Sequence, residues 1–370
     1  MEDAIFAEII KKSKNMLYRH AKASAQAYLF AKRFKDRTGI EARRPEGVRH
    51  KIWDLHPHFD PEYCLKHAGY LARAIWGNIR KGNYTPVPAL TYLKKKDGGG
   101  TRNIMVFTIP DSAVSNVFFK KITDRNIKTL SPNCFSYRTD GRNRYDAISQ
   151  LRSAISGPSV YVVQFDFAKY FDSIRHDYLS NIIGDRSVFS ITPLEQKLMS
   201  SFMSHRYADK DSYPKNKTAA KEYQFDVKRR GVPQGCSLSN FLANIAAHSL
   251  DKKLEMMNGQ FVRYGDDTII ITYTYDDAVR IIDEFESLCI ISGISINFSK
   301  SPGIAMLKAL PGAHHEEFLK YRGTPLGVGL IDDFDYVGFP YPANAGSATD
   351  RGTRRCLTAP ASLAPATIWS

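Results

Sequence analysis

Two adjacent aspartates, Asp266 and Asp267, stand between two short apolar runs in the stretch FVRYGDDTIIIT. The runs predict two β-strands, and Gly265 with the aspartates predicts the tight turn of a hairpin over residues 260–273. Carboxylates this close repel each other, and a turn needs no more than one of them. The pair is therefore either an ordinary solvated turn or a site at which something neutralises both charges.

A third aspartate, Asp166, gives the pair a chemical purpose. It ends the apolar run VYVVQFD, which predicts a buried strand. If this strand and the hairpin are neighbours in one sheet, three carboxylates converge at its end, and hard cations neutralise such a cluster. Two Mg²⁺ ions about 3.5–4 Å apart stabilise the attacking and leaving oxygens of a phosphoryl transfer. The sequence thus predicts a metal-dependent catalytic site at Asp166, Asp266 and Asp267.

The rest of the chain mixes helices and strands without regular βα alternation, which predicts an α+β fold. Apolar periodicity and turn residues define the expected elements. Helices are expected over 3–35, 61–81, 237–257 and 276–292, with one starting at Asp111 and others within 175–204. Strands are expected within 85–110 as a hairpin with a Gly-rich basic loop, over 160–166, within 205–230 and over 294–297.

The bulk composition favours a cytosolic, nucleic-acid-binding protein. The chain of 370 residues has 52 Lys and Arg against 38 Asp and Glu, a formal charge of +14 that favours a polyanionic partner. Five cysteines without a CxxC pair argue against a disulfide scaffold or a structural zinc site. We see no signal peptide and no apolar run long enough to cross a bilayer, so a cytoplasmic location without a membrane partner is expected.

Three motifs carry a resemblance to a known family. Asp166 is followed five residues later by Phe171, a Pro-Gln-Gly loop occupies 233–235, and Tyr264 and Gly265 precede the aspartate pair. In this order they resemble the palm-and-fingers polymerases, specifically the reverse transcriptases. The resemblance implies that the three aspartates and the backbone carbonyl of Phe167 bind metal, and that Phe171, Gln234 and Gly235 contact the incoming nucleotide.

Further motifs extend the resemblance over residues 85–341. LKKKDGGGTRNIMV resembles a fingertip hairpin whose basic residues, here Lys95 and Arg102, hold the triphosphate. GISINFSKS is similar to a segment that ends in a basic residue, here Lys300. DYVGFPY resembles the turn that grips the primer strand, which implies that role for Val337, Gly338 and Phe339.

The family implies a right-hand polymerase with a basic helical region at 1–84, fingers at 85–158 and a palm at 159–341. A fingers-derived insert is expected near 205–230 and an irregular tail at 342–370, so the thumb is truncated or absent. The implied cofactor is a pair of Mg²⁺ ions, with Mn²⁺ as an alternative, and the implied partners are dNTPs and an RNA or DNA template and primer. The N-terminal helices, a non-coding RNA or a second protein would complete the clamp, and oligomerisation stays open.

The sequence leaves alternatives for the subgroup of reverse transcriptases and for the type of polymerase reaction. The resemblance places Phe171 where the family has a bulky aromatic that excludes a 2′-hydroxyl. This implies the use of deoxynucleotides, in contrast to the RNA polymerases that also carry Gly-Asp-Asp. SLSNFLANIAAHSLDKKLE is closest to bacterial antiphage-defence enzymes, with retron and group II intron enzymes as near neighbours. A template-independent or protein-primed polymerase is the second hypothesis. A catalytically silent nucleic-acid-binding subunit is the third.

Overall fold

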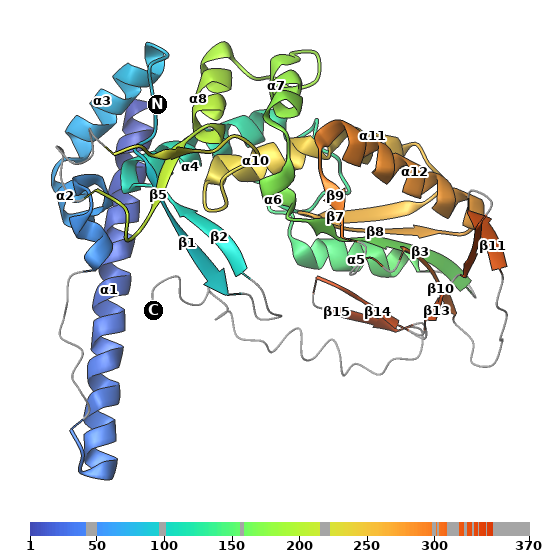
Figure 1. The fold of residues 1–370 in the computed structure, drawn as a ribbon, viewed down its shortest axis with the longest axis horizontal. Helices are drawn as coiled ribbons and strands as arrows, with labels where there is room; N and C mark the ends of the chain where they lie inside the picture. Colours follow the sequence, from blue (N-terminus) through green and yellow to red (C-terminus); the bar gives the residue numbers. More distant parts are fainter. Residues whose placement is uncertain are drawn as a thin grey trace.

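The computed structural model describes most of the chain, and all structural statements below concern its described residues. These are residues 1–41, 50–95, 101–155, 159–214, 223–297, 301, 303–308, 318–321, 324–327, 329–331, 333–337 and 339–342. Helices and two larger sheets alternate along the long axis of the molecule (Figure 1), so the expected α+β class is confirmed.

The N-terminal region is helical, as predicted. The long helix α1 (Glu2–Thr38) ends at Gly39, whose φ of 68° gives the left-handed cap that glycine adopts without steric cost. The helix predicted over 61–81 is instead two helices, α2 (Pro61–Lys66) and α3 (Ala68–Arg80), separated at His67. Two short 3₁₀ turns, η1 (Lys51–Asp54) and η2 (Pro57–Phe59), precede them. The second half of α1 projects past the other labelled elements in Figure 1.

A four-stranded sheet lies beside these helices. The expected hairpin is formed by β1 (Ala89–Lys95) and β2 (Thr101–Val106), and its loop at 96–100 lies outside the described residues. The segment 205–230 adds β5 (Arg206–Asp209), which pairs parallel to β1, and β6 (Asp226–Val227). Helix α4 (Ile109–Asn126) begins two residues before the predicted start, because Thr108 caps it and Pro110 fits its first turn.

A five-stranded sheet forms the other half of the molecule, in the order β13-β10-β3-β8-β7. Its central strand β3 is apolar on both faces: Val163 belongs to the same buried cluster as helix α12, and Val162 to that of helix α5. In Figure 1, α12 lies above the sheet and α5 below it. The bounds are β3 (Ser159–Phe165), β7 (Gln260–Tyr264), β8 (Asp267–Thr272), β10 (Gly303–Lys308), β13 (Gly329–Ile331), α5 (Arg144–Ala154) and α12 (Tyr275–Ser292).

Further elements complete the described fold. The helix predicted over 237–257 breaks at Ala247 into α10 (Ser237–Ala246), which is buried almost all round, and α11 (His248–Glu255). The remaining elements are β4 (Phe167–Ala168), α6 (Tyr170–Ser173), α7 (His176–Gly184), α8 (Pro193–Met203), β9 (Ser295–Ile296), β11 (Phe318–Tyr321), β12 (Thr324–Gly327), β14 (Asp333–Tyr336) and β15 (Phe339–Pro342). Among the described helices, none has the length and apolar character that crossing a bilayer requires.

Candidate active site

Strand register brings the three aspartates to one end of the five-stranded sheet. In the β3–β8 pair Phe165 lies opposite Thr268. Asp166 follows Phe165 and Asp267 precedes Thr268, so the two aspartates lie at the same end of these antiparallel strands. In the β7–β8 pair Tyr264 lies opposite Asp267, so Asp266 occupies the turn itself. The expectation that the apolar strand and the hairpin are neighbours in one sheet is therefore confirmed.

The carboxylates act on one another electrostatically. Burial, followed by the negative charges of Asp266 and Asp166, raises the pKa of Asp267 to about 6. By accessible surface the Asp267 side chain is exposed, which fits a group on the rim of a hollow, surrounded by protein but open on one side. Among the described residues, no three acidic, His or Cys side chains already stand at metal-ligand spacing. The donor set nevertheless suits a hard cation, because such an ion would remove the repulsion that raises this pKa.

Neighbouring polar groups hold Asp166 in place. Its backbone N–H donates to Ser301 Oγ at 3.0 Å, and its carboxylate accepts from Asn297 Nδ2 at 3.0 Å. The backbone N–H of Asn297 also donates to the Asp166 carbonyl at 2.8 Å. The segment after α12 therefore fixes the end of β3 at the site. Next along the chain, Phe167 is buried against Phe285 of α12.

The turn that carries Asp266 is held from inside the protein. Gly265 donates its N–H to Ser136 Oγ at 2.7 Å, and its carbonyl accepts from Arg263 Nη1 at 3.0 Å. Arg263 is buried and forms an ion pair with Asp251 of α11 at 2.6 Å. Burial alone would lower the pKa of Arg263, but Asp251 outweighs it and holds that pKa well above its ordinary value. Asn244 of α10 accepts a further bond from Arg263 Nη1 at 3.2 Å.

Two aromatic side chains stand over the turn. The Tyr137 and Phe171 rings meet edge to face, with their centroids 6.3 Å apart. A methyl group built on Gly265 would lie 3.6 Å from the Tyr137 hydroxyl, so this phenol lies directly above the turn. Burial, followed by the charge of Asp266, raises the pKa of Tyr137 to about 12. Phe171 is half-buried, whereas its neighbour Tyr170 is buried, so Phe171 is the aromatic that remains accessible.

The Pro-Gln-Gly loop contacts both β2 and α6. The N–H of Met105 in β2 donates to the Gln234 carbonyl at 2.8 Å, and Gly235 lies so close that a Cβ there would be 2.3 Å from the Met105 oxygen. The Gln234 side chain donates to Asp172 of α6 at 3.3 Å, and Lys228 forms an ion pair with the same carboxylate at 2.8 Å. The hydrogen bond to Asp172 therefore places Gln234 close to Phe171.

Lys95 and Arg102, the basic residues named from the sequence, do not share one face of the β1–β2 hairpin. Lys94 lies opposite Arg102 and Lys95 opposite Thr101, and side chains alternate along a strand, so Lys95 and Arg102 project from opposite faces of the hairpin. Lys95 and Arg102 are exposed. The positive charge of Arg102 acts on Tyr137, which places Arg102 near the turn. The sequence interpretation did not name Lys94, the residue that shares a face with Arg102.

The last two motifs are only partly described. Lys300 and Gly338 lie outside the described residues. Val337 is half-buried with φ 52°, directly before that gap, and for Phe339 only the backbone of β15 is described. The adjacent Tyr336 is buried, and its hydroxyl donates to the Val262 carbonyl at 3.2 Å. This contact fastens the β14–β15 hairpin to β7, the strand that leads into the turn of Asp266.

The sequence interpretation missed the residues that support the turn. Arg263 stands inside the quoted hairpin motif, and an arginine amid apolar residues of a buried strand is a signal, because such a charge needs a partner. Its partner Asp251 lies twelve residues earlier on another element, and Ser136 and Tyr137 come from a loop without a motif. Spacing alone could not have joined these segments.

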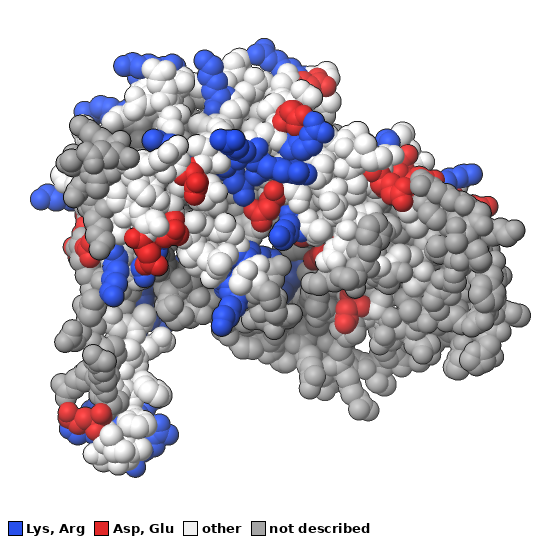
Figure 2. All heavy atoms as spheres, viewed as in Figure 1, with Lys and Arg blue, Asp and Glu red and all other residues white. Residues whose placement is uncertain are grey.

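One face of the molecule carries a region rich in positive charge. Lys and Arg side chains gather over the middle of the face shown in Figure 2, between the two sheets, with acidic side chains beside them. Three carboxylates at one end of the sheet can bind cations, and these cations can hold an anionic substrate. A half-buried aromatic and a loop with a glycine lie beside them. The arrangement suits the transfer of a phosphoryl or nucleotidyl group.

Comparisons with known proteins find the following similarities. The chain is 28% identical over 219 residues to the transposon TX1 uncharacterized 149 kDa protein of Xenopus laevis, which covers 52% of this chain but 16% of the relative. It is similar to apo telomerase of Candida tropicalis truncated from its C-terminal domain, with 17% identity and a TM-score of 0.46 over 74% of this chain and 58% of that one. A complex of that organism's telomerase with a TWJ fragment of telomeric RNA matches with 16% identity and a TM-score of 0.46, over 78% and 50% of the two chains.

The family comparison covers most of the chain. Residues 93–339 match the family described as reverse transcriptase (RNA-dependent DNA polymerase). The matched range includes all three aspartates, the Pro-Gln-Gly loop and both large sheets except the start of β1. Members of this family are nucleotidyltransferases. The chain belongs to the reverse transcriptase (RNA-dependent DNA polymerase) family.

Proposed function

We propose that this protein is a metal-dependent DNA polymerase that copies RNA by adding deoxynucleotides to a 3′ end. The observation that carries the proposal is that Asp166, Asp266 and Asp267 converge at one end of the five-stranded sheet, beside the half-buried Phe171. A binding protein needs no such crowding of carboxylates, whereas a cation-dependent phosphoryl transfer does. The role of each residue below belongs to the same proposal.

Asp166, Asp266 and Asp267, with the Phe167 carbonyl, would hold two Mg²⁺ or Mn²⁺ ions. When bound, the ions supply Lewis-acid stabilisation of the attacking and leaving oxygens. The protein's own contribution is to keep the carboxylates in place: Asn297 orients Asp166, and Arg263 with Ser136 orients the turn that carries Asp266. This rigid backing limits how far the turn must move to form the site.

The surroundings would bind the nucleotide. Arg102 on the β1–β2 hairpin, with Lys95 or Lys94, would neutralise the triphosphate, and Lys300 would add a further charge. Gln234 and Gly235 would place backbone against the nucleotide, since a glycine admits a close approach. Phe171, held against Tyr137, would meet the sugar at the position of a 2′-hydroxyl and so favour deoxynucleotides. Val337, Gly338 and Phe339 would contact the primer strand.

The domain layout follows the sheets. The five-stranded sheet within 159–341 would be the palm, and the β1–β2 hairpin with α4 and α5, within 85–158, would form most of the fingers. The segment 205–230 would be an insert that returns to the fingers, a placement supported by the pairing of β5 with β1. Residues 1–84 would form a helical region that supports the fingers.

A polymerase assay tests the proposal directly. Purified protein is incubated with Mg²⁺ and labelled dNTPs, with an RNA template and DNA primer or with neither. We expect product only with the RNA template, and none with Asp266→Asn. Asp124→Asn, on an exposed position of α4, removes the same charge and should leave synthesis unchanged. Product without any template would favour the template-independent or protein-primed alternative, and no product in any condition would favour a silent binding subunit.

A place among bacterial antiphage enzymes rests on the sequence resemblance of residues 237–255 alone. If the protein acts in defence, cells that carry it should survive phage challenge, and Asp266→Asn should remove the protection at equal protein level. Protection that survives the substitution would separate any defence role from DNA synthesis. The template and the primer type would come from sequencing the product.

A further inference from the structure

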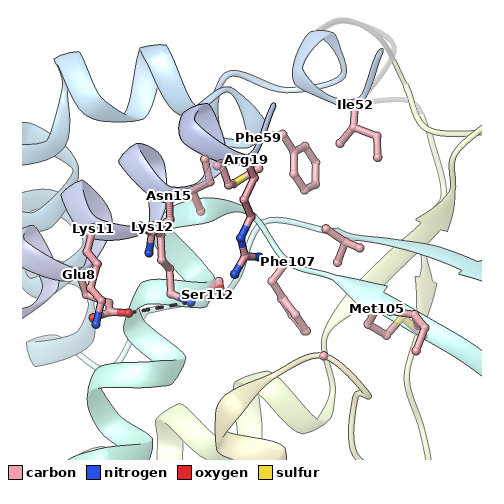
Figure 3. Close-up of a pocket in the computed structure, with 15 residues that line it drawn as sticks. Glu8, Lys11, Lys12, Asn15, Arg19, Ile52, Phe59, Met105, Phe107 and Ser112 are labelled. Atoms are coloured by element: carbon pink, nitrogen blue, oxygen red, sulfur yellow. Dashed lines mark ion pairs between the residues drawn. The ribbon is translucent and has the colours of Figure 1, made fainter. Parts of the chain in front are cut away.

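A cavity of about 340 Å³ lies outside the proposed catalytic site, between α1, β2 and the start of α4. Figure 3 shows Lys12 and Arg19 extending into it from α1, above Phe107. Its floor is apolar, with Phe59 and Phe107 among the lining residues, and Gly235 closes one side. The volume is within the range of small-ligand sites, about 300–1,000 Å³.

The charges of this cavity are incompletely balanced. Lys12 has a single acidic neighbour in the described part of the chain, Glu8, at the long distance of 4.0 Å. Glu8 also accepts a bond from Asn116 of α4 at 2.7 Å, so its charge is shared. Burial lowers the pKa of Lys12, which means that its ammonium lacks full compensation. Lys11 and Arg19 have no ion pair with any described residue, so the cavity as a whole is cationic.

The cationic face continues beyond the cavity along α1. Residues spaced by three or four share one helix face, and from the cavity onward this spacing selects mostly basic or amide side chains. We call this face the α1 stripe, and its members are Lys11, Lys12, Asn15, Arg19, Lys22, Gln26, Arg33 and Arg37. From Lys11 to Arg37 it spans about 39 Å at 1.5 Å per residue. Within the described chain, none of its Arg residues has an acidic partner within ion-pair distance, and Lys35, off the stripe, pairs with Glu41.

We propose that the cavity and the α1 stripe bind the phosphate backbone of a single-stranded nucleic acid, with one base in the cavity. This proposal rests on the proposed function, because the strand it assigns is the unread 5′ part of the template. Gly235 lines the cavity while the adjacent Gln234 reaches Asp172 near the catalytic turn, so a strand here is continuous with the site.

The length of the stripe favours a strand over a free nucleotide. A mononucleotide could occupy the cavity alone and would leave Lys22, Arg33 and Arg37 without a function. A strand places a phosphate against each of these residues in turn and an unpaired base on the apolar floor, the usual combination in single-strand sites. The exposed Tyr18 and Phe30, which border the α1 stripe on the same helix, offer further surfaces on which bases can stack.

A matched pair of double variants tests the stripe. Arg19→Gln with Arg33→Gln removes two stripe charges, whereas Lys14→Gln with Lys32→Gln removes two exposed charges on a different face of the same helix. The probe is a primer–template with a twelve-nucleotide 5′ overhang, compared with the same duplex made blunt. We expect the stripe variant to bind the overhang at least fivefold more weakly and to lower the salt slope by about 0.7 per lost contact, with blunt binding unchanged. The control variant should match the unmodified protein.

A third variant tests the cavity. Ser112→Phe would place a ring in the cavity from the half-buried Ser112 in the first turn of α4, and should reduce overhang binding while circular dichroism stays unchanged. Equal losses in the stripe and control variants, or no loss in any variant, would overturn the proposal. Lost binding of a labelled dNTP with intact overhang binding would also overturn it, in favour of a nucleotide site. Because binding is read without synthesis, a failure of the polymerase assay would not be mistaken for a failure here.

Discussion

Arg263 and Asp251 form a buried ion pair, 2.6 Å between Nη2 and the carboxylate, with the two side chains only 1% and 2% exposed. The same guanidinium donates to the carbonyl of Gly265, so the pair connects α11 to the turn that carries Asp266. A buried guanidinium that donates to Asp251, Gly265 and Asn244 leaves little freedom to the turn. This relationship gives the first prediction.

The stability losses caused by removing each partner of the pair should not add. Arg263→Leu or Asp251→Leu leaves an uncompensated buried charge, for which we expect a loss of about 3–5 kcal/mol in the free energy of unfolding. The double variant should lose clearly less than the sum of the two. Urea denaturation measures this coupling, and additive losses would contradict it. The double variant should still synthesise DNA more slowly, because the Gly265 carbonyl has lost its donor.

Gly235 and Gly265 should differ sharply in how well they tolerate substitution by alanine. Gly235→Ala should abolish correct folding of the loop, because its Cβ would lie 2.3 Å from the Met105 carbonyl oxygen. Gly265→Ala meets only the Tyr137 hydroxyl at 3.6 Å, so its cost is the left-handed φ of 73°, about 1 kcal/mol. Thermal unfolding of the two variants measures the difference. Equal shifts in melting temperature would show that the backbone contact at Gly235 relaxes freely.

Phe171 should control the choice of sugar. Phe171→Ala should raise the incorporation of ribonucleotides relative to deoxynucleotides, since the ring would no longer block a 2′-hydroxyl. Tyr137→Phe keeps the edge-to-face contact with Phe171 and should leave the selectivity unchanged. The ratio of kcat/KM for the two nucleotides is the measurement. An unaltered ratio in Phe171→Ala would mean that Phe171 is only a packing residue.

Lys94 and Lys95 at the end of β1 should contribute unequally to the binding of dNTPs. Lys94 shares a face with Arg102, whereas Lys95 projects from the other face. Lys94→Gln should therefore raise the KM for dNTPs in the same direction as Arg102→Gln, and Lys95→Gln should raise it less. Steady-state kinetics at saturating template separates these effects. A larger effect at Lys95 would place the triphosphate on the face opposite to Arg102.

Asp111 should give the protein a measurable pH dependence. Burial raises its pKa to about 6, despite bonds from Thr108, Tyr84 and Val87. A carboxyl whose folded pKa lies above its unfolded value of about 3.9 binds more protons when folded. Its contribution to stability is therefore present below about pH 4 and is lost as the pH rises through 6, by up to about 3 kcal/mol.

A comparison with Asp111→Asn isolates this contribution. The half-buried His58 and the buried His205, whose pKa values are lowered to about 4 chiefly by desolvation, act with the opposite sign, because their stabilising effect is lost as the pH falls. Both histidines are present in the unmodified protein and in Asp111→Asn, so their effect cancels in the comparison. The destabilisation caused by Asp111→Asn should shrink as the pH rises from 4 to 6.5, because the contribution of Asp111 is lost over that range. Denaturation at several pH values measures it. A cost that grows with pH would mean that the three donors outweigh burial and keep Asp111 ionised.

Local patterns predicted the elements better than their ends. The hairpin around Asp266 and the strand before Asp166 were both predicted, because alternating and continuous apolar runs report directly on burial. Two helices were predicted as single and are broken, at His67 and Ala247. Apolar periodicity continues across both breaks, so the sequence signal could not show where the chain changes direction.

The sequence by itself determined the chemistry of this protein: which carboxylates, aromatics and glycines are available, and in what order along the chain. Only the tertiary structure decided their geometry. It joined Arg263 to Asp251, set Tyr137 against Phe171, and separated Lys95 from the face of Arg102. The physical reason is that these contacts depend on strand register and on packing between segments far apart in the chain, which no local periodicity encodes.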